Sequence, residues 1–140
     1  MLSLEMEKNG VKEFMSRLLK EDLFNDFEAR TVEILTGHKI TIDATSNISA
    51  WNETRPLVYE IIKHCPKPKQ IKIVFSYTKE IHTNAAALFL NLVYENDGIC
   101  FTTATSQKEF VLDKGIDFAW DNFVREFFEK AGINVKDRTV

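Results

Sequence analysis

An aromatic stripe between residues 113 and 132 constrains the fold more than any other feature of this sequence. Its apolar side chains recur at the spacing of one face of an α-helix. The members of the stripe are Ile116, Trp120, Phe123, Val124, Phe127, Phe128 and Ala131. Burying one large apolar side chain stabilises a fold by roughly 1.5–3 kcal/mol, so four aromatic rings on one face must be covered. Gly132 predicts the end of the helix, with Ile133 packing back on Phe128. The sequence does not decide where this helix begins, because Asp113 and Asp117 are both candidate N-caps.

The nearest apolar surface lies just before this helix. Residues 88–94 and 99–105 are rich in aromatic and β-branched residues, which predicts two strands of an antiparallel hairpin. Asp97-Gly98 can supply the positive φ angles of the tight turn between them. The apolar triplet at 110–112 predicts one more short strand. We therefore expect the aromatic helix to pack on an antiparallel sheet.

The first half of the chain predicts further strands and two more helices. Alternation of apolar and polar residues predicts strands over 2–6, 28–35, 40–44 and 71–77. Helical spacing predicts a helix over residues 11–19.

A second helix precedes the strand at 71–77. Its stripe consists of Trp51, Leu57, Val58, Ile61, Ile62 and Cys65. Ser49 is a candidate N-cap. Because proline fits only the first turn of a helix, Pro56 favours a start near Thr54 over a kinked helix that begins earlier.

The predicted order is therefore β-α-β-β-α-β-β-β-β-α, in a single α+β domain over residues 1–140. The sheet is expected to be mainly antiparallel with helices packed on one face, and residues 134–140 are expected to form a frayed polar tail. Two alternatives remain at the level of topology. One is a helix-grip or TATA-binding-protein-like arrangement, and the other is a sliding-clamp-like arrangement.

Composition narrows the class of protein. The net charge of −3 disfavours a dedicated nucleic-acid binder. The sequence contains no run of eighteen apolar residues, so no membrane span is predicted. Residues 1–8 lack the apolar core of a signal peptide. A cytoplasmic protein is therefore expected. Cys65 and Cys100 are expected to be reduced thiols. Open sheet edges leave a homodimer as one alternative for the assembly.

One candidate ligand site is a hydroxyl-lined strand end with a lysine beside it. Its residues are Thr103, Thr105 and Lys108. Hydroxyls and an ammonium group can bind an anion or a polar ligand. Threonine also favours strands, so a solvated sheet face is the simpler interpretation of the same pattern.

A second candidate is a local basic cluster near the end of the second predicted helix. Its residues are Lys63, His64, Lys67 and Lys69. Such a cluster could meet phosphate or a negatively charged partner. Positive charge is also favoured at any helix C-terminus, which gives the cluster a purely structural explanation.

The sequence predicts no catalytic residue, metal site or cofactor. His38, His64 and His82 are far apart, and no pair of histidines or cysteines has the spacing of metal ligands. We therefore expect a non-enzymatic binding or interaction protein. One alternative is a small-molecule binder or enzyme with a cavity between the last helix and the sheet. The other is a clamp-like module that acts near nucleic acid.

The chain also resembles a family of small, uncharacterised bacterial proteins described only as a domain of unknown function. The segments that carry the resemblance are 11–19, Trp51 with Arg55-Pro56, 88–91, 103–106, 112–114 and 119–121. The resemblance implies no activity and supplies no catalytic residue.

Overall fold

The computed structural model describes residues 1–45, 48–65 and 67–138 as eight strands, three α-helices and one 3₁₀ turn. The strands are Ser3–Met6 (β1), Phe27–Leu35 (β2), Lys39–Asp43 (β3), Ser49–Ala50 (β4), Gln70–Tyr77 (β5), Ala85–Glu95 (β6), Gly98–Gln107 (β7) and Val135–Asp137 (β8). The helices are Val11–Lys20 (α1), Trp51–His64 (α2) and Gly115–Lys130 (α3), and the 3₁₀ turn is Lys8–Gly10.

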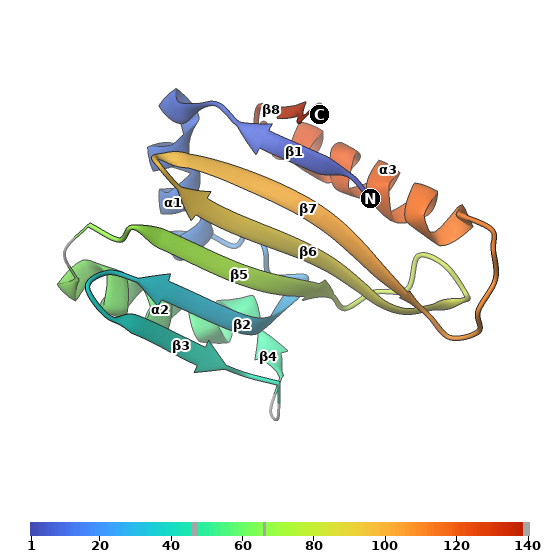
Figure 1. Cartoon of the computed structure of the whole chain (residues 1–140), viewed down its shortest axis with the longest axis horizontal. Helices are drawn as coiled ribbons and strands as arrows, with labels where there is room; N and C mark the ends of the chain where they lie inside the picture. Colours follow the sequence, from blue (N-terminus) through green and yellow to red (C-terminus); the bar gives the residue numbers. More distant parts are fainter. Residues whose placement is uncertain (46–47, 66, 139–140) are drawn as a thin grey trace.

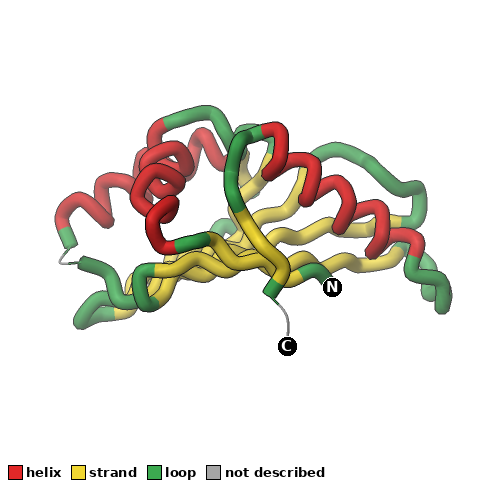
Figure 2. The backbone as a smooth tube through the Cα atoms, turned by 90° about the horizontal axis from the view of Figure 1, so that it is seen from above, coloured by secondary structure: helices red, strands yellow, loops and turns green. Residues whose placement is uncertain are grey.

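All strands belong to one antiparallel sheet in the order β3-β2-β5-β6-β7-β1-β8, and β4 pairs with β2 beside β3 (Figure 1). The three helices lie on one face of this sheet (Figure 2). The predicted α+β class, with an antiparallel sheet and helices on one face, is confirmed.

Side chains of β6 show how the two faces differ. Leu88, Leu90 and Leu92 are buried on the side of the helices. The residues between them point to the opposite face, which no helix covers in Figure 2. We call this the open face of the sheet.

The aromatic stripe of α3 packs on the inner face, as predicted. Trp120 and Phe128 are fully buried. The Phe128 ring lies 4.6 Å from that of Phe101 on β7, and the Trp120 ring lies 5.5 Å from that of Tyr77 on β5. Trp120 also donates its indole N–H to the Phe89 carbonyl at 2.8 Å. Aromatic rings therefore fill the space between α3 and the sheet.

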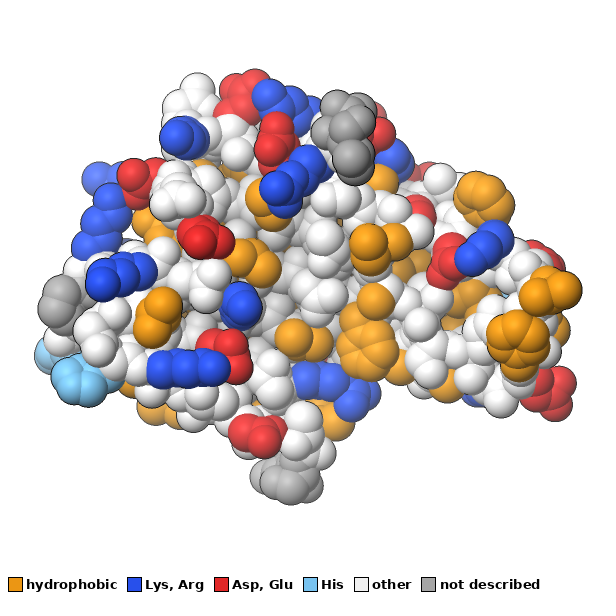
Figure 3. All heavy atoms as spheres, in the orientation of Figure 1, with side chains coloured by type: hydrophobic (Ala, Val, Ile, Leu, Met, Phe, Trp, Pro, Cys, Tyr) orange, Lys and Arg blue, Asp and Glu red, His pale blue; other side chains and the backbone are white. Residues whose placement is uncertain are grey.

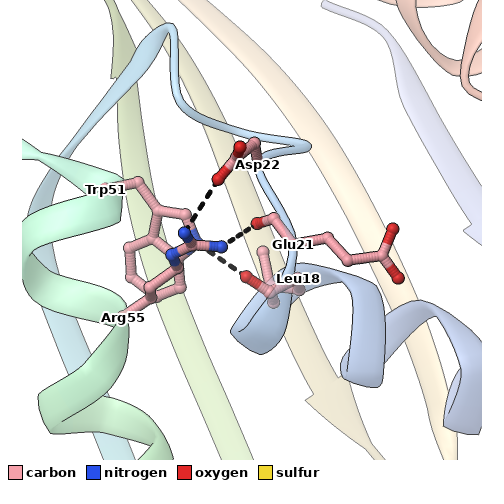
Figure 4. Close-up of polar contacts among 5 residues, drawn as sticks. All are labelled: Leu18, Glu21, Asp22, Trp51 and Arg55. Carbon is pink, nitrogen blue, oxygen red and sulfur yellow. Dashed lines mark hydrogen bonds and ion pairs between the residues drawn. The ribbon is translucent and has the colours of Figure 1, made fainter.

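Helix α2 is joined to the end of α1 by two side chains (Figure 4). Trp51 donates its indole N–H to the Leu18 carbonyl at 2.9 Å. Arg55 donates to the Glu21 carbonyl and to the Asp22 carboxylate, the latter at 2.9 Å. These donors satisfy carbonyl groups that a helix C-terminus leaves without partners.

The predicted start of α2 near Thr54 is wrong. The helix begins at Trp51, which is fully buried, and Pro56 lies inside it. Ser49 is not the N-cap, because its hydroxyl pairs with that of Thr54 at 3.2 Å and the N-cap position is Ala50. Burial and hydrogen bonding of Trp51 outweigh the one backbone hydrogen bond that a proline removes.

The β6–β7 turn is shifted by one residue from its predicted position. Asn96 and Asp97 have positive φ angles of 53° and 62°, while Gly98 already pairs with Glu95. The turn residues are therefore Asn-Asp, both of which tolerate the left-handed region.

Residues 110–112 do not form the predicted strand. The neighbouring position along β7 is taken by β1, so the sheet continues through the N-terminus instead. Part of the expected frayed tail is also ordered, because β8 pairs with β1 and Arg125 binds both carboxylate oxygens of Asp137, at 2.7 and 3.1 Å. Residues 139–140 of that tail lie outside the described residues.

Both ends of α3 use local hydrogen bonds. Gly132 has a φ of 72°, and Ile133 donates its N–H to the Phe128 carbonyl at 2.9 Å, which confirms the predicted C-terminus. The N-cap position is Lys114, so it is neither of the two aspartates. Asp113 nevertheless accepts the Gly115 N–H at 2.5 Å.

None of the helices in the described part of the chain has the length and apolar character needed to cross a membrane.

Phe128→Ala is expected to lower the free energy of unfolding by about 3–5 kcal/mol, because it opens a cavity among fully buried rings. Phe118→Ala makes the same change on the exposed side of the same helix and is expected to stay within about 0.5 kcal/mol of wild type. Urea unfolding curves of both variants measure this difference. Equal losses in the two variants would contradict a filled interface.

Candidate functional site

The two predicted threonines lie between β7 and α3. Thr103 is buried, accepts the Leu2 N–H at 2.8 Å and donates to Asp121 at 2.6 Å. Thr105 donates to Asp117 at 2.5 Å. Both hydroxyls therefore face the helix rather than the open face of the sheet.

Lys108 is separated from these hydroxyls. It is exposed and directly follows β7, and its backbone N–H donates to the Asn84 carbonyl at 2.8 Å. A shallow hollow of about 380 Å³ lies nearby, lined by Thr105, Gln107 and Phe110. Ligand binding by the three predicted residues stays a prediction.

The predicted basic cluster is divided between the last turn of α2 and a groove beyond it. His64 contacts Glu60 at 3.4 Å on α2. Lys67 and Lys69 line a groove of about 500 Å³ beside the β6–β7 turn. Lys63 is exposed on the same helical turn as His64. Binding of an anion or a partner by this cluster stays a prediction.

Lys67 has an ion-pair partner within the chain. Its ammonium lies 2.7 Å from an oxygen of Asp97. This hydrogen bond holds the pKa of the Asp97 carboxyl below its usual value and raises the pKa of Lys67. The contact connects the α2–β5 connection to the β6–β7 turn, so a ligand at Lys67 would compete with Asp97.

A feature that sequence reasoning missed is the apolar tip, which we define as Phe110, Val111 and Leu112. These side chains are 83%, 43% and 85% exposed. Figure 3 shows hydrophobic side chains gathered at the end of the molecule where Figure 1 places the β7–α3 loop, residues 108–114. The signal in the sequence was an apolar triplet between charged residues, which we interpreted as a strand.

Side-chain hydrogen bonds hold the β7–α3 loop in place. The Asn84 side-chain amide donates to the Glu109 carbonyl at 2.9 Å and accepts the Glu109 N–H at 3.0 Å. It thus makes the pair of hydrogen bonds that the backbone of a neighbouring strand would make. Gln107 accepts the Val111 N–H at 3.1 Å. The apolar tip is therefore presented by a loop that is fixed at its base.

One more apolar side chain is exposed at the same end of the molecule. Phe118 lies near the start of α3 and is 68% exposed. It lies on the side of the helix opposite to Trp120 and Val124, so it takes no part in the core.

Groups suited to chemistry are dispersed. The described residues contain no cluster of three or more histidine, cysteine, aspartate or glutamate side chains able to hold a metal ion. Both cysteines are free, and Cys100 accepts a long contact of 3.5 Å from Arg138. Cys100 and Arg138 line a groove of about 600 Å³ that also includes Glu5 and Lys136.

The fold and its surface define a small α+β domain with a filled aromatic interior and an exposed apolar loop. The family model described as "Family of unknown function (DUF5721)" matches residues 17–136 of the 140, so the chain belongs to this family. The predicted resemblance to a domain of unknown function is thereby confirmed. No curated protein and no solved structure matches the chain.

Asn84→Ala is expected to speed amide hydrogen exchange at Glu109 and Val111 by about ten- to thirtyfold, because two hydrogen bonds at the base of the loop are lost. Asn91→Ala on the open face is the matched control and is expected to leave this loop unchanged. Hydrogen exchange read by NMR resolves the two cases. Unchanged exchange in the Asn84 variant would show that other contacts hold the loop.

Proposed function

We propose that this protein is a non-enzymatic interaction module that binds a partner protein through the apolar tip. The observation that carries the proposal is the exposure of three neighbouring apolar side chains on a loop held at its base by Asn84. Large exposed apolar patches on a folded domain mark interaction sites more often than scattered apolar residues do.

Energetics support a docking role for the tip. One fully buried aromatic side chain covers roughly 150–250 Å², and each Å² of apolar surface removed from water contributes about 25 cal/mol. Phe110 and Leu112 together can therefore supply several kcal/mol to binding. Since the loop is already fixed, little conformational entropy is lost when the tip docks.

The size of the tip favours one kind of partner. Its exposed area is a few hundred Å², below the roughly 800 Å² per partner of a typical stable interface. Contact between two tips would therefore be too small for a stable dimer. A partner that offers an apolar pocket around Phe110 and Leu112 would instead use them as central anchors.

The interior of the molecule supports binding over catalysis. The alternative with a ligand cavity between α3 and the sheet needs space that Trp120, Phe128 and Phe101 occupy at the centre of the interface. A hollow of about 380 Å³ lies at the edge of this interface, where the end of α3 meets Leu4 and Val135. The hydroxyls of Thr103 and Thr105 are already bonded to carboxylates of α3. The clamp-like alternative needs a positively charged surface, and the chain carries a net charge of −3.

We further propose that the module acts in the cytoplasm. Cys65 and Cys100 are both free thiols, and unpaired cysteines are typical of proteins in a reducing compartment.

The Phe110→Ser/Leu112→Ser double variant is expected to weaken partner binding by at least about thirtyfold, because two anchor side chains are removed. Wild type and variant, each immobilised, are incubated with an extract of the source organism, and retained proteins are quantified by mass spectrometry. A protein retained by wild type and lost by the variant is then purified, and its affinity for both is measured directly.

Leu35→Ser is the matched control, because Leu35 is an exposed apolar residue at the other end of the sheet. This variant is expected to retain the same partner with unchanged affinity. If every retained protein binds wild type and the tip variant equally, the proposed site is wrong.

A further inference from the structure

Strand β3 leaves one edge of the sheet uncovered. Among the described residues it pairs with β2 alone, and its five residues contain neither proline nor glycine (Figure 1). Such an edge presents unpaired backbone N–H and C=O groups to any strand that approaches it.

The opposite edge is less suited to pairing. Strand β8 has only three residues, against five in β3. Charged side chains of both edges have partners within the chain, so strand length is what separates the two edges. Among the two edges, β3 is therefore the better template for a further strand.

The backbone pattern shows which groups of β3 point outward. Ala44 donates its N–H to the Arg30 carbonyl of β2 at 2.9 Å. Alternate residues of an antiparallel strand bond to the same neighbour, so Ile40 and Ile42 also bond to β2. The outward backbone groups belong to Lys39, Thr41 and Asp43.

The side chains of β3 are complementary to themselves. We propose that two copies of this chain pair antiparallel through β3, with Thr41 on the two-fold axis. In this register Lys39 faces Asp43 of the second copy, Ile40 faces Ile42, and Thr41 faces its own equivalent. The same register brings the outward backbone groups of the two strands into hydrogen-bonded pairs. Each β3 strand therefore offers the other copy both opposite charges and backbone hydrogen-bond partners.

Helix α2 adds apolar surface above this edge. Arg55 and Tyr59 lie on the flank of α2 that contacts α1, since Arg55 binds Asp22 and the Lys20 ammonium lies 5.4 Å from the Tyr59 ring centre. Leu57, on the opposite flank, is 53% exposed. That flank faces away from α1 toward the side of the sheet where β3 lies (Figure 1).

Two half-buried side chains of β3 extend the same surface. Ile40 and Ile42 pair with Ile34 and Val32, which are buried on the inner face. They therefore point toward the face of the sheet that the helices cover (Figure 2). A second copy at the edge would cover this apolar strip together with the backbone groups.

The charge pattern favours a second copy over an unrelated strand. Any extended peptide could bond to the outward backbone groups. Within the chain, Lys39 lies 3.5 Å from Glu33 and Asp43 accepts from Thr45, and both side chains are exposed. A strand with an acidic residue opposite Lys39 and a basic residue opposite Asp43 would add a second partner to each, and β3 itself has both. Lysine on an edge can also serve to prevent pairing, in which case the chain stays monomeric.

The test uses two charge reversals on the full-length chain. Lys39→Asp and Asp43→Lys each place like charges at both ends of the symmetric pair, so each variant alone is expected to dimerise at least about tenfold more weakly than wild type. An equimolar mixture restores both attractive pairs, and it is expected to form a 1:1 heterodimer. Sedimentation equilibrium over micromolar to millimolar concentrations measures all three samples, and circular dichroism confirms that each variant is folded.

A backbone variant tests the same edge independently. Thr41→Pro removes an N–H that points outward, so it leaves the β2 ladder intact and is expected to abolish the dimer. A monomeric wild type would overturn the proposal. So would a wild-type dimer that these variants leave unchanged, or a mixture of the two charge variants that stays monomeric. The apolar tip lies at the other end of the sheet, so failure here leaves the proposed partner site untouched.

Discussion

Burial of the aromatic face of α3 is the interaction on which the rest of the structure depends. Trp120, Phe127 and Phe128 meet rings from distant parts of the chain, including Phe24 from the α1–β2 connection, Tyr77 from β5 and Phe101 from β7. Polar contacts then fix the position of the helix, because Thr103 and Thr105 bind Asp121 and Asp117 along one flank of it. The N-terminus is tied to the same place, since Leu2 donates its N–H to Thr103.

Because aromatic side chains fill the centre of the space between α3 and the sheet, the candidate binding sites lie on the outer surface of the domain. Within the described residues, exposed apolar side chains concentrate at the apolar tip and at Phe118, and the uncovered β3 edge lies at the opposite part of the sheet. The two surfaces can act together. A dimer paired through β3 would carry two apolar tips, and a partner with two pockets would bind such a dimer more tightly than either tip alone.

Periodicity predicted most of the architecture, because burial of an apolar face leaves a direct imprint on residue spacing. The α3 stripe, its end at Gly132 and the β6–β7 hairpin follow from local sequence. What periodicity missed depends on partners distant in the chain. Residues 110–112 look like a strand in isolation, but β1 occupies the position beside β7, and β8 is ordered through Arg125 and Glu5. The start of α2 depends on Leu18, which accepts the Trp51 indole from another helix. The exposed tip was missed for the same reason. A local pattern does not show whether a partner strand is available for residues 110–112, and β1 takes the place beside β7.

Native-state hydrogen exchange of the Trp120 indole N–H tests whether the space between α3 and the sheet is filled. This group is fully enclosed and bonded to the Phe89 carbonyl, so a filled interface predicts that it exchanges only when the whole domain unfolds. Its exchange should then show the same dependence on denaturant as the global unfolding transition. Exchange through local opening, with little dependence on denaturant, would show that the space between α3 and the sheet is accessible and would contradict a filled interface.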